Sequence, residues 1–158
     1  MINIRAAEAK DTGIILSLIK ELAEYENLSD SVVATEESIL KYAFVPNPLI
    51  HILIAEYNNE IAGFALYYYN FSTFVGKPGI YLEDVFIKEV FRGYGIGKLL
   101  LQRIAQITIE SNFGRFEWSV LNWNPARKFY EHLGAKALEE WKTYRIDGNE
   151  LRKLAENK

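Results

Sequence analysis

The segment Arg92-Gly-Tyr-Gly-Ile-Gly97 lies between a strand-like run, Tyr81–Ile87, and a helix-like run that begins near Lys98. Its three glycines stand at alternate positions, where they let the backbone adopt φ > 0 and pass close to a ligand. The backbone amides then point at whatever precedes the helix, where the helix dipole adds about half a positive charge. A strand, a glycine loop and a helix in this order predict an anion site at the start of the helix, suited to a pyrophosphate.

Two other phosphate-binding loops are excluded by the spacing of the residues. A Walker A loop needs Gly five residues before Gly97, where Arg92 stands, and Ser or Thr in place of Leu99. A dinucleotide fingerprint needs a further Gly at position 98 or 100, which are Lys98 and Leu100. The remaining alternative is a glycine-rich connection with no ligand.

The composition is that of a soluble globular protein, with 158 residues that fit a single domain over 1–158. The net charge of −3 argues against a nucleic-acid partner. The chain has no cysteine and only two histidines, His51 and His132, so we expect no metal site. His51 sits in an apolar run and is expected to be a packed core or edge residue. No apolar run approaches the ~20 residues of a membrane span, and charges interrupt the first twenty residues, so we expect a cytoplasmic protein without a membrane partner.

Apolar spacing and turn residues divide the rest of the chain into elements. Before the glycine loop, the predicted elements are a strand at 2–5, helices at 12–26 and 35–44, strands at 50–56, 61–69 and 80–88, and a loop at 70–79. After it, they are a helix from 98, a strand at 115–121, a helix at 125–132, a strand at 141–146, a turn at 147–149 and a short terminal helix. This order predicts a mixed α/β (α+β) fold with a largely antiparallel first half.

Two motifs together resemble a known family. Arg92-x-x-Gly95-x-Gly97 after a strand resembles the acetyl-coenzyme A (acetyl-CoA) signature of the GNAT superfamily of N-acetyltransferases. Asn124–Tyr130 followed by Leu133-Gly-Ala135 is similar to that family's second motif, although one residue fewer separates Asn124 from Ala126. The likeness covers nearly the whole chain. It is closest to the diamine acetyltransferases, of the spermidine/spermine and thialysine types, through Ile19–Glu26, Gly63–Tyr68 and Tyr81–Asp84.

The resemblance implies a GNAT fold, whose central sheet is flanked by helices and splayed at the cofactor site, and acetyl-CoA as cosubstrate. The backbone of Val85, Phe86 and Ile87 would pair with the pantetheine amides like an added strand. The pyrophosphate would be held by Arg92, Gly93, Tyr94, Gly95, Ile96, Gly97 and Lys98. Asn124 and Arg127 complete the implied cofactor-binding set.

Acetylation of an amine requires a proton to be removed, because a lysine-like amine has a pKa of about 10.4. Glu83 and Asp84 are adjacent on a predicted strand, so regular alternation would point them to opposite faces. The resemblance implies that Glu83 is the base, acting through water, and that Tyr130 is the general acid near the thioester sulfur. The alternatives are a carboxylate that anchors a neighbouring loop and a tyrosine that packs in the core.

Acidic residues of the two N-terminal helices would attract a cation. The resemblance implies that the acceptor site is lined by Tyr25, Glu26, Glu36 and Asp84 and is completed by a second copy in a homodimer. The predicted substrate is a small cationic amine, a diamine, polyamine or lysine-like amine. The alternatives are a protein or peptide N-acetyltransferase and a coenzyme A-binding module without catalysis.

Overall fold

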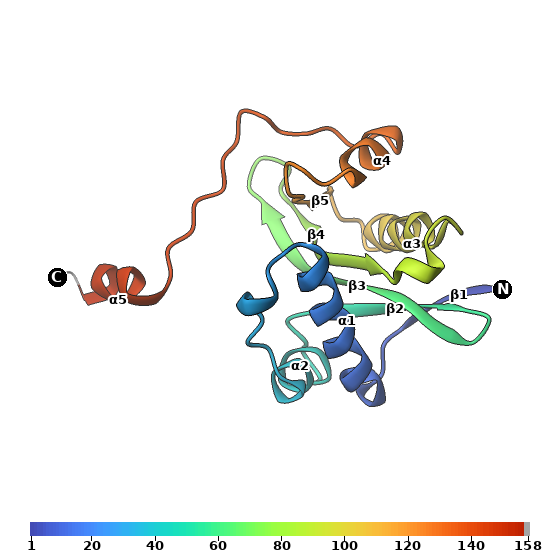
Figure 1. The fold of residues 1–158 in the computed structure, drawn as a ribbon. Coiled ribbons are helices and arrows are strands. Elements are labelled where there is room, and N and C mark those ends of the chain that lie inside the picture. The colour runs from blue at the N-terminus through green and yellow to red at the C-terminus, as the bar shows by residue number, and fades with distance from the viewer. Residues whose placement is uncertain (157–158) are drawn as a thin grey trace. The chain divides into compact units, whose positions relative to one another are not determined.

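The computed structural model describes residues 1–156, which form two compact units that divide between Ser119 and Val120. The first unit contains a five-stranded sheet in the order β1-β2-β3-β4-β5. The pairs β1–β2, β2–β3 and β3–β4 are antiparallel, and β5 runs parallel to β4. Helices flank this mixed sheet (Figure 1), which confirms the predicted α/β class and the largely antiparallel arrangement.

The elements of the first unit follow the apolar pattern of the sequence. They are β1 (Ile2–Ala6), α1 (Thr12–Tyr25), α2 (Glu36–Ala43), β2 (His51–Tyr57), β3 (Glu60–Ser72), β4 (Lys77–Ile87), α3 (Ile96–Glu110) and β5 (Phe116–Trp118). Thr35 caps α2, because its hydroxyl oxygen accepts from the Ser38 amide at 3.1 Å. Asn27, with φ of 58°, ends α1, and the Leu28 amide donates back to the Ala23 carbonyl at 2.7 Å.

The sheet is covered on both faces. On one face, α1 and α2 bury Ile15, Leu18 and Ile39 against Ile54, Phe64 and Phe86. α3 contacts β1, β2, β3 and β4, and its buried side chains Leu100, Leu101 and Ile104 cover the other face (Figure 1). This two-sided core explains the nearly continuous apolar runs in β2 and β3.

β3 and β4 approach each other closely at Gly63. A Cβ on Gly63 would lie 2.2 Å from the Phe86 carbonyl oxygen, so only glycine fits this position of β3.

His51, at the start of β2, is stacked on the rings of Tyr67 and Tyr69, with centroids 5.3 Å and 4.7 Å away. Burial lowers the pKa of His51, and its prediction as a packed residue is confirmed.

Several predicted boundaries were wrong. The predicted loop at 70–79 is largely strand, because Asn70, Phe71 and Ser72 pair with Gly79, Pro78 and Lys77. The glycines and proline there suggested a loop, yet the hairpin turn needs only the few residues between Ser72 and Lys77. The strand predicted at 115–121 is shorter, and α3 begins two residues before Lys98.

The second unit contains α4 (Ala126–His132) and α5 (Gly148–Glu156), and Gly134 follows α4 with φ of 96°. The predicted strand at 141–146 was wrong. Its Trp141 and Tyr144 side chains are 73% and 92% exposed, and no described strand pairs with it. β-prone side chains do not make a strand unless a neighbouring backbone completes the hydrogen-bond ladder. Of the predicted turn at 147–149, Gly148 and Asn149 are instead the first residues of α5. Among residues 1–156, no helix has both the length and the apolar character needed to cross a membrane.

Candidate active site

The glycine loop forms an open cradle at the start of α3. Gly93 and Gly95 have φ of 86° and 80°, in the region that favours glycine, and a Cβ added to either would meet no atom within 4 Å. Gly95 is the N-cap of α3 and has no side chain to cap the free amides of the first turn. Open space, free amides and the helix dipole together fit a phosphate group.

Gly97 differs from the other two glycines of the loop. It lies in the first turn of α3 and does not have positive φ, and its added Cβ would make an ordinary 3.9 Å contact with Ile87. Of the three glycines of the loop, Gly93 and Gly95 therefore use the freedom to adopt positive φ. Tyr94, also in the loop, packs on the Tyr57 ring with centroids 4.8 Å apart, and Lys98 is exposed.

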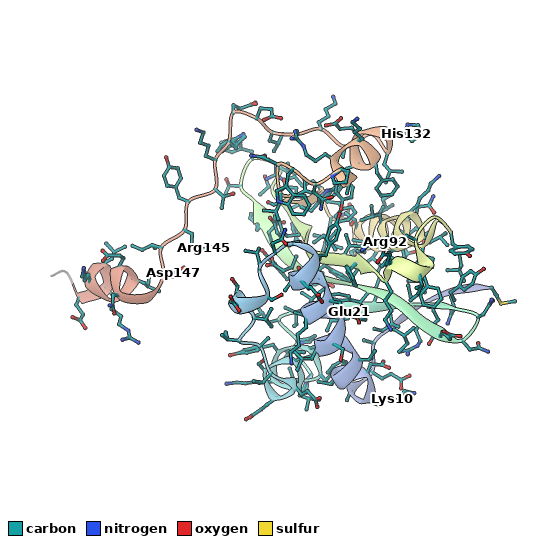
Figure 2. All side chains as sticks on the ribbon, viewed as in Figure 1. Lys10, Glu21, Arg92, His132, Arg145 and Asp147 are labelled. Carbon is teal, nitrogen blue, oxygen red and sulfur yellow. The ribbon has the colours of Figure 1, made fainter. Side chains whose placement is uncertain are left out.

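The Arg92 side chain is directed toward α1 and β4 (Figure 2). Its Nε donates to the Ile87 carbonyl oxygen at 3.0 Å. Its guanidinium carbon lies 4.9 Å from the centroid of the Tyr25 ring and 5.6 Å from that of Phe86. These contacts occupy the guanidinium with groups of the protein itself, so its predicted part in holding a pyrophosphate stays a prediction.

β4 separates from β5 where the predicted pantetheine site begins. The parallel pairing covers only Ile80 to Leu82 of β4, opposite Phe116 to Trp118. Beyond it, Val85, Phe86 and Ile87 pair with β3 on their other side. This part of β4 has no partner in β5, so its backbone edge is suited to receive an extended ligand such as the pantetheine arm.

A β-bulge at Glu83 changes the geometry expected for the two carboxylates. Tyr67 pairs with Leu82 and its neighbour Leu66 pairs with Asp84, which leaves Glu83 as the extra residue of β4. The regular alternation, from which Glu83 and Asp84 were expected to point to opposite faces, is therefore interrupted at this pair. The two side chains interact, because the negative charge of Glu83 raises the pKa of Asp84.

Glu26 joins these carboxylates from the end of α1. Burial raises the pKa of Asp84 to about 7, and the charges of Glu83 and then Glu26 add to this shift. Burial also raises the pKa of Glu26, which is the C-cap of α1. We name Glu26, Glu83 and Asp84 the carboxylate cluster. A buried carboxyl whose ionisation is hindered by two neighbouring negative charges forms a site that favours a cation.

Two tyrosines that the sequence did not single out border this cluster. Burial, Glu83 and Tyr81 raise the pKa of Tyr68, whose ring lies 5.3 Å from the ring of Tyr81. The hydroxyl groups of Tyr81 and Ser119 share a 2.6 Å hydrogen bond. The signals in the sequence were that both tyrosines lie in segments that carry the family resemblance and that Tyr81 stands two residues before Glu83. These tyrosines give one side of the cluster a polar aromatic surface.

The structure does not bring Glu36 to the carboxylate cluster. Glu36 opens α2, and its carboxylate lies beside Gly13, at the first turn of α1. Glu26 caps the other end of the same helix, and the thirteen residues from Gly13 to Glu26 correspond to roughly 20 Å at ~1.5 Å per residue. Within one copy of the chain, Glu36 is therefore remote from Asp84.

The second unit holds the remaining predicted residues, and their local contacts are clear. The Asn124 side-chain oxygen accepts from the Ala126 amide at 2.9 Å and so closes the shortened turn before α4. Arg127 donates to the Asn122 carbonyl at 3.3 Å and lies 3.5 Å from the Glu139 carboxylate. Tyr130 lies on α4 with its ring 5.6 Å from that of Phe129. Among residues 1–156, no group of three or more His, Cys, Asp or Glu side chains is arranged to hold a metal ion.

The chain was compared with known proteins. The model of the Acetyltransferase (GNAT) family matches residues 15–135. A thialysine N-epsilon-acetyltransferase from Sus scrofa is 39% identical over 96% of this chain and 96% of its own length. The spermidine/spermine N(1)-acetyltransferase-like protein 1 of Homo sapiens is 38% identical over 97% of this chain and 24% of its own length. Among solved structures, an integron cassette protein from the mobile metagenome of V. cholerae has a TM-score of 0.80 at 29% identity, and covers 98% of this chain and 97% of its own.

Proposed function

Because this chain belongs to the GNAT family of acetyltransferases, we propose that it acetylates a primary amine of a small cationic molecule. As a member of this family it is an N-acetyltransferase with acetyl-CoA as cosubstrate. The proposed acceptor is a lysine-like amine such as thialysine, or a diamine or polyamine. The observation that carries the proposal is the carboxylate cluster, in which the charges of Glu83 and Glu26 act on the buried Asp84, beside the part of β4 that has no partner in β5.

The carboxylate cluster suits an acceptor that arrives as an ammonium ion. An alkyl ammonium with a pKa near 10.4 stays protonated at neutral pH, so it binds as a cation and must then lose a proton. Asp84, with its pKa raised to about 7, changes charge in the range where such an enzyme works. Because Glu83 and Asp84 interact, we assign the uptake of the proton to this pair, with Glu83 acting through a water molecule.

We propose that acetyl-CoA is held by backbone groups more than by side chains. The amides from Gly93 to Lys98 would hold the pyrophosphate, with Lys98 adding charge, and the edge from Val85 to Ile87 would pair with the pantetheine arm. Asn124 and Arg127 are proposed to complete the donor site. When bound, acetyl-CoA supplies an acetyl group as a thioester. Tyr130 would donate the proton that the departing sulfur needs.

The reaction can be measured by release of free thiol from acetyl-CoA. The protein contains no cysteine, so its own side chains give no background in such an assay. We expect release with thialysine, lysine, ornithine, putrescine or spermidine, and little with neutral amines or with peptide N-termini. Glu26→Gln should raise the KM of the preferred amine, whereas Glu60→Gln, at the exposed start of β3, is the matched control.

Two results would contradict the proposal. Release with peptides alone would identify a protein N-acetyltransferase. Tight binding of coenzyme A without release for any acceptor would identify a binding module.

A homodimer and a cytoplasmic location are also part of the proposal. The distance between Glu36 and the carboxylate cluster within one chain leaves room for Glu36 to serve the site of a second copy. Light scattering on the purified protein, with and without acetyl-CoA, tests the oligomeric state, and a mass of one chain under both conditions would exclude the dimer.

A further inference from the structure

We propose that Arg92 is a positioning residue that fixes the acceptor side of the active site, although it belongs to the donor loop. This inference rests on the proposed function. The side chain makes three contacts: Nε with the Ile87 carbonyl oxygen at 3.0 Å, and the guanidinium with the rings of Tyr25 and Phe86 at 4.9 Å and 5.6 Å. All three partners belong to α1 or β4.

The contact with Tyr25 reaches the residue next to Glu26. Tyr25 is the last residue of α1, and Glu26 is its C-cap, where the helical hydrogen bonds end. A ring held at this point limits how far the end of α1 moves from β4. Glu26 acts on Asp84 through its charge, so the position of this helix end affects the charge of the acceptor site.

The contacts with Phe86 and Ile87 connect Arg92 to β4, the strand that carries Asp84 of the proposed acceptor site. Phe86 lies two residues after Asp84 on the same face of β4, where it pairs with Phe64 while Asp84 pairs with Leu66. The planar guanidinium therefore joins the strand that carries Asp84 to the helix that carries Glu26. Lysine has neither the planar stacking surface nor the Nε geometry, and it would not make both contacts.

Arg92 immediately precedes Gly93, the first glycine of the loop with positive φ. The glycine that begins the proposed acetyl-CoA loop and the arginine whose side chain holds the acceptor side of the site are therefore adjacent in the chain. Arg92 acts through Tyr25 and β4, and the donor phosphates are left to the amides and Lys98.

Arg92→Gln and Arg92→Lys test this assignment, with Arg103→Gln as the control that removes one arginine from exposed α3. We expect the amine KM to rise about fivefold in both variants, the size of one lost exposed cation–π contact, while kcat changes less than twofold. The Kd of coenzyme A, measured by calorimetry, should change less than threefold. A tenfold weaker Kd with an unchanged amine KM would overturn the proposal and make Arg92 a pyrophosphate ligand.

A double-mutant cycle separates this proposal from the proposed function. Arg92→Gln, Tyr25→Leu and the double variant are compared by urea unfolding, which needs no turnover. If the two side chains are coupled, the double variant should be less destabilised than the sum of the single variants. Additive effects would overturn the positioning role even in an active enzyme. Absence of acetyl transfer in the wild type, with coupling intact, would overturn the proposed function alone.

Discussion

Asp84→Asn is expected to make the protein more stable and a poorer enzyme. The pKa of Asp84 rises from an ordinary value of 3.8 to about 7 in the folded state. A folded pKa above the unfolded one means that the folded protein holds the proton more tightly. The contribution of Asp84 to stability is therefore full below about pH 4, falls as pH rises, and is lost above pH 7. At ~1.4 kcal/mol per unit, this difference of about three units amounts to up to about 4 kcal/mol at pH 8.

Asparagine has nearly the same shape and no charge, so the variant avoids this penalty. Urea unfolding, followed by tryptophan fluorescence at pH 4.5, 6, 7 and 8, should show a gain of about 1 kcal/mol at pH 4.5 that grows to about 2–4 kcal/mol at pH 8. Asp30→Asn, at an exposed position, should show no such gain at any pH. The amine KM of Asp84→Asn should rise at least about tenfold, because a cation ligand is lost. An equal gain at pH 4.5 and pH 8, or a loss of stability at pH 8, would refute the reasoning.

Three further variants test other parts of the site. Tyr130→Phe should lower kcat by about 10²-fold with little change in the KM of acetyl-CoA, and an unchanged kcat under rate-limiting chemistry would remove Tyr130 from the mechanism. Gly95→Ala should raise the KM of acetyl-CoA about tenfold more than Gly97→Ala, because of these two glycines only Gly95 has positive φ. Equal effects of the two substitutions would contradict the proposal that the loop backbone holds the pyrophosphate. Glu26→Gln should shift the pH profile of kcat/KM for the amine to lower pH, because it removes a negative charge that raises the pKa of Asp84. An unshifted pH profile would show that the charge of Glu26 does not affect the ionisation of Asp84.

The sequence predicted the fold well where side-chain pattern and packing agree. The apolar spacing of α1 and the capping residues of α2 mark real helices, and the glycine loop lies where a strand gives way to a helix. The prediction from sequence failed where pairing between strands decides the secondary structure. Pro78 and Gly79 suggested a loop, yet the ladder between β3 and β4 extends through them. Tyr144 and Ile146 suggested a strand at 141–146, which has no described partner.

The sequence named the carboxylates of the candidate site but could not give their geometry. The motif identified Glu83 and Asp84, but alternation along one strand cannot reveal a bulge, because a bulge is a property of two paired strands. The contact between Arg92 and Tyr25 joins residues far apart in the chain, and no local pattern encodes it. The raised pKa of Asp84 likewise depends on burial by the folded chain.

The bulge at Glu83 also means that this residue can be removed without disturbing the register. Leu82 and Asp84 already pair with the consecutive residues Tyr67 and Leu66, so a chain lacking residue 83 would have an uninterrupted ladder with every other side chain on its present face. Most single deletions inside a strand turn half of its side chains to the wrong face. Here the deletion would leave the same framework with one acidic group fewer, a ready reference protein for measuring ligand binding without turnover.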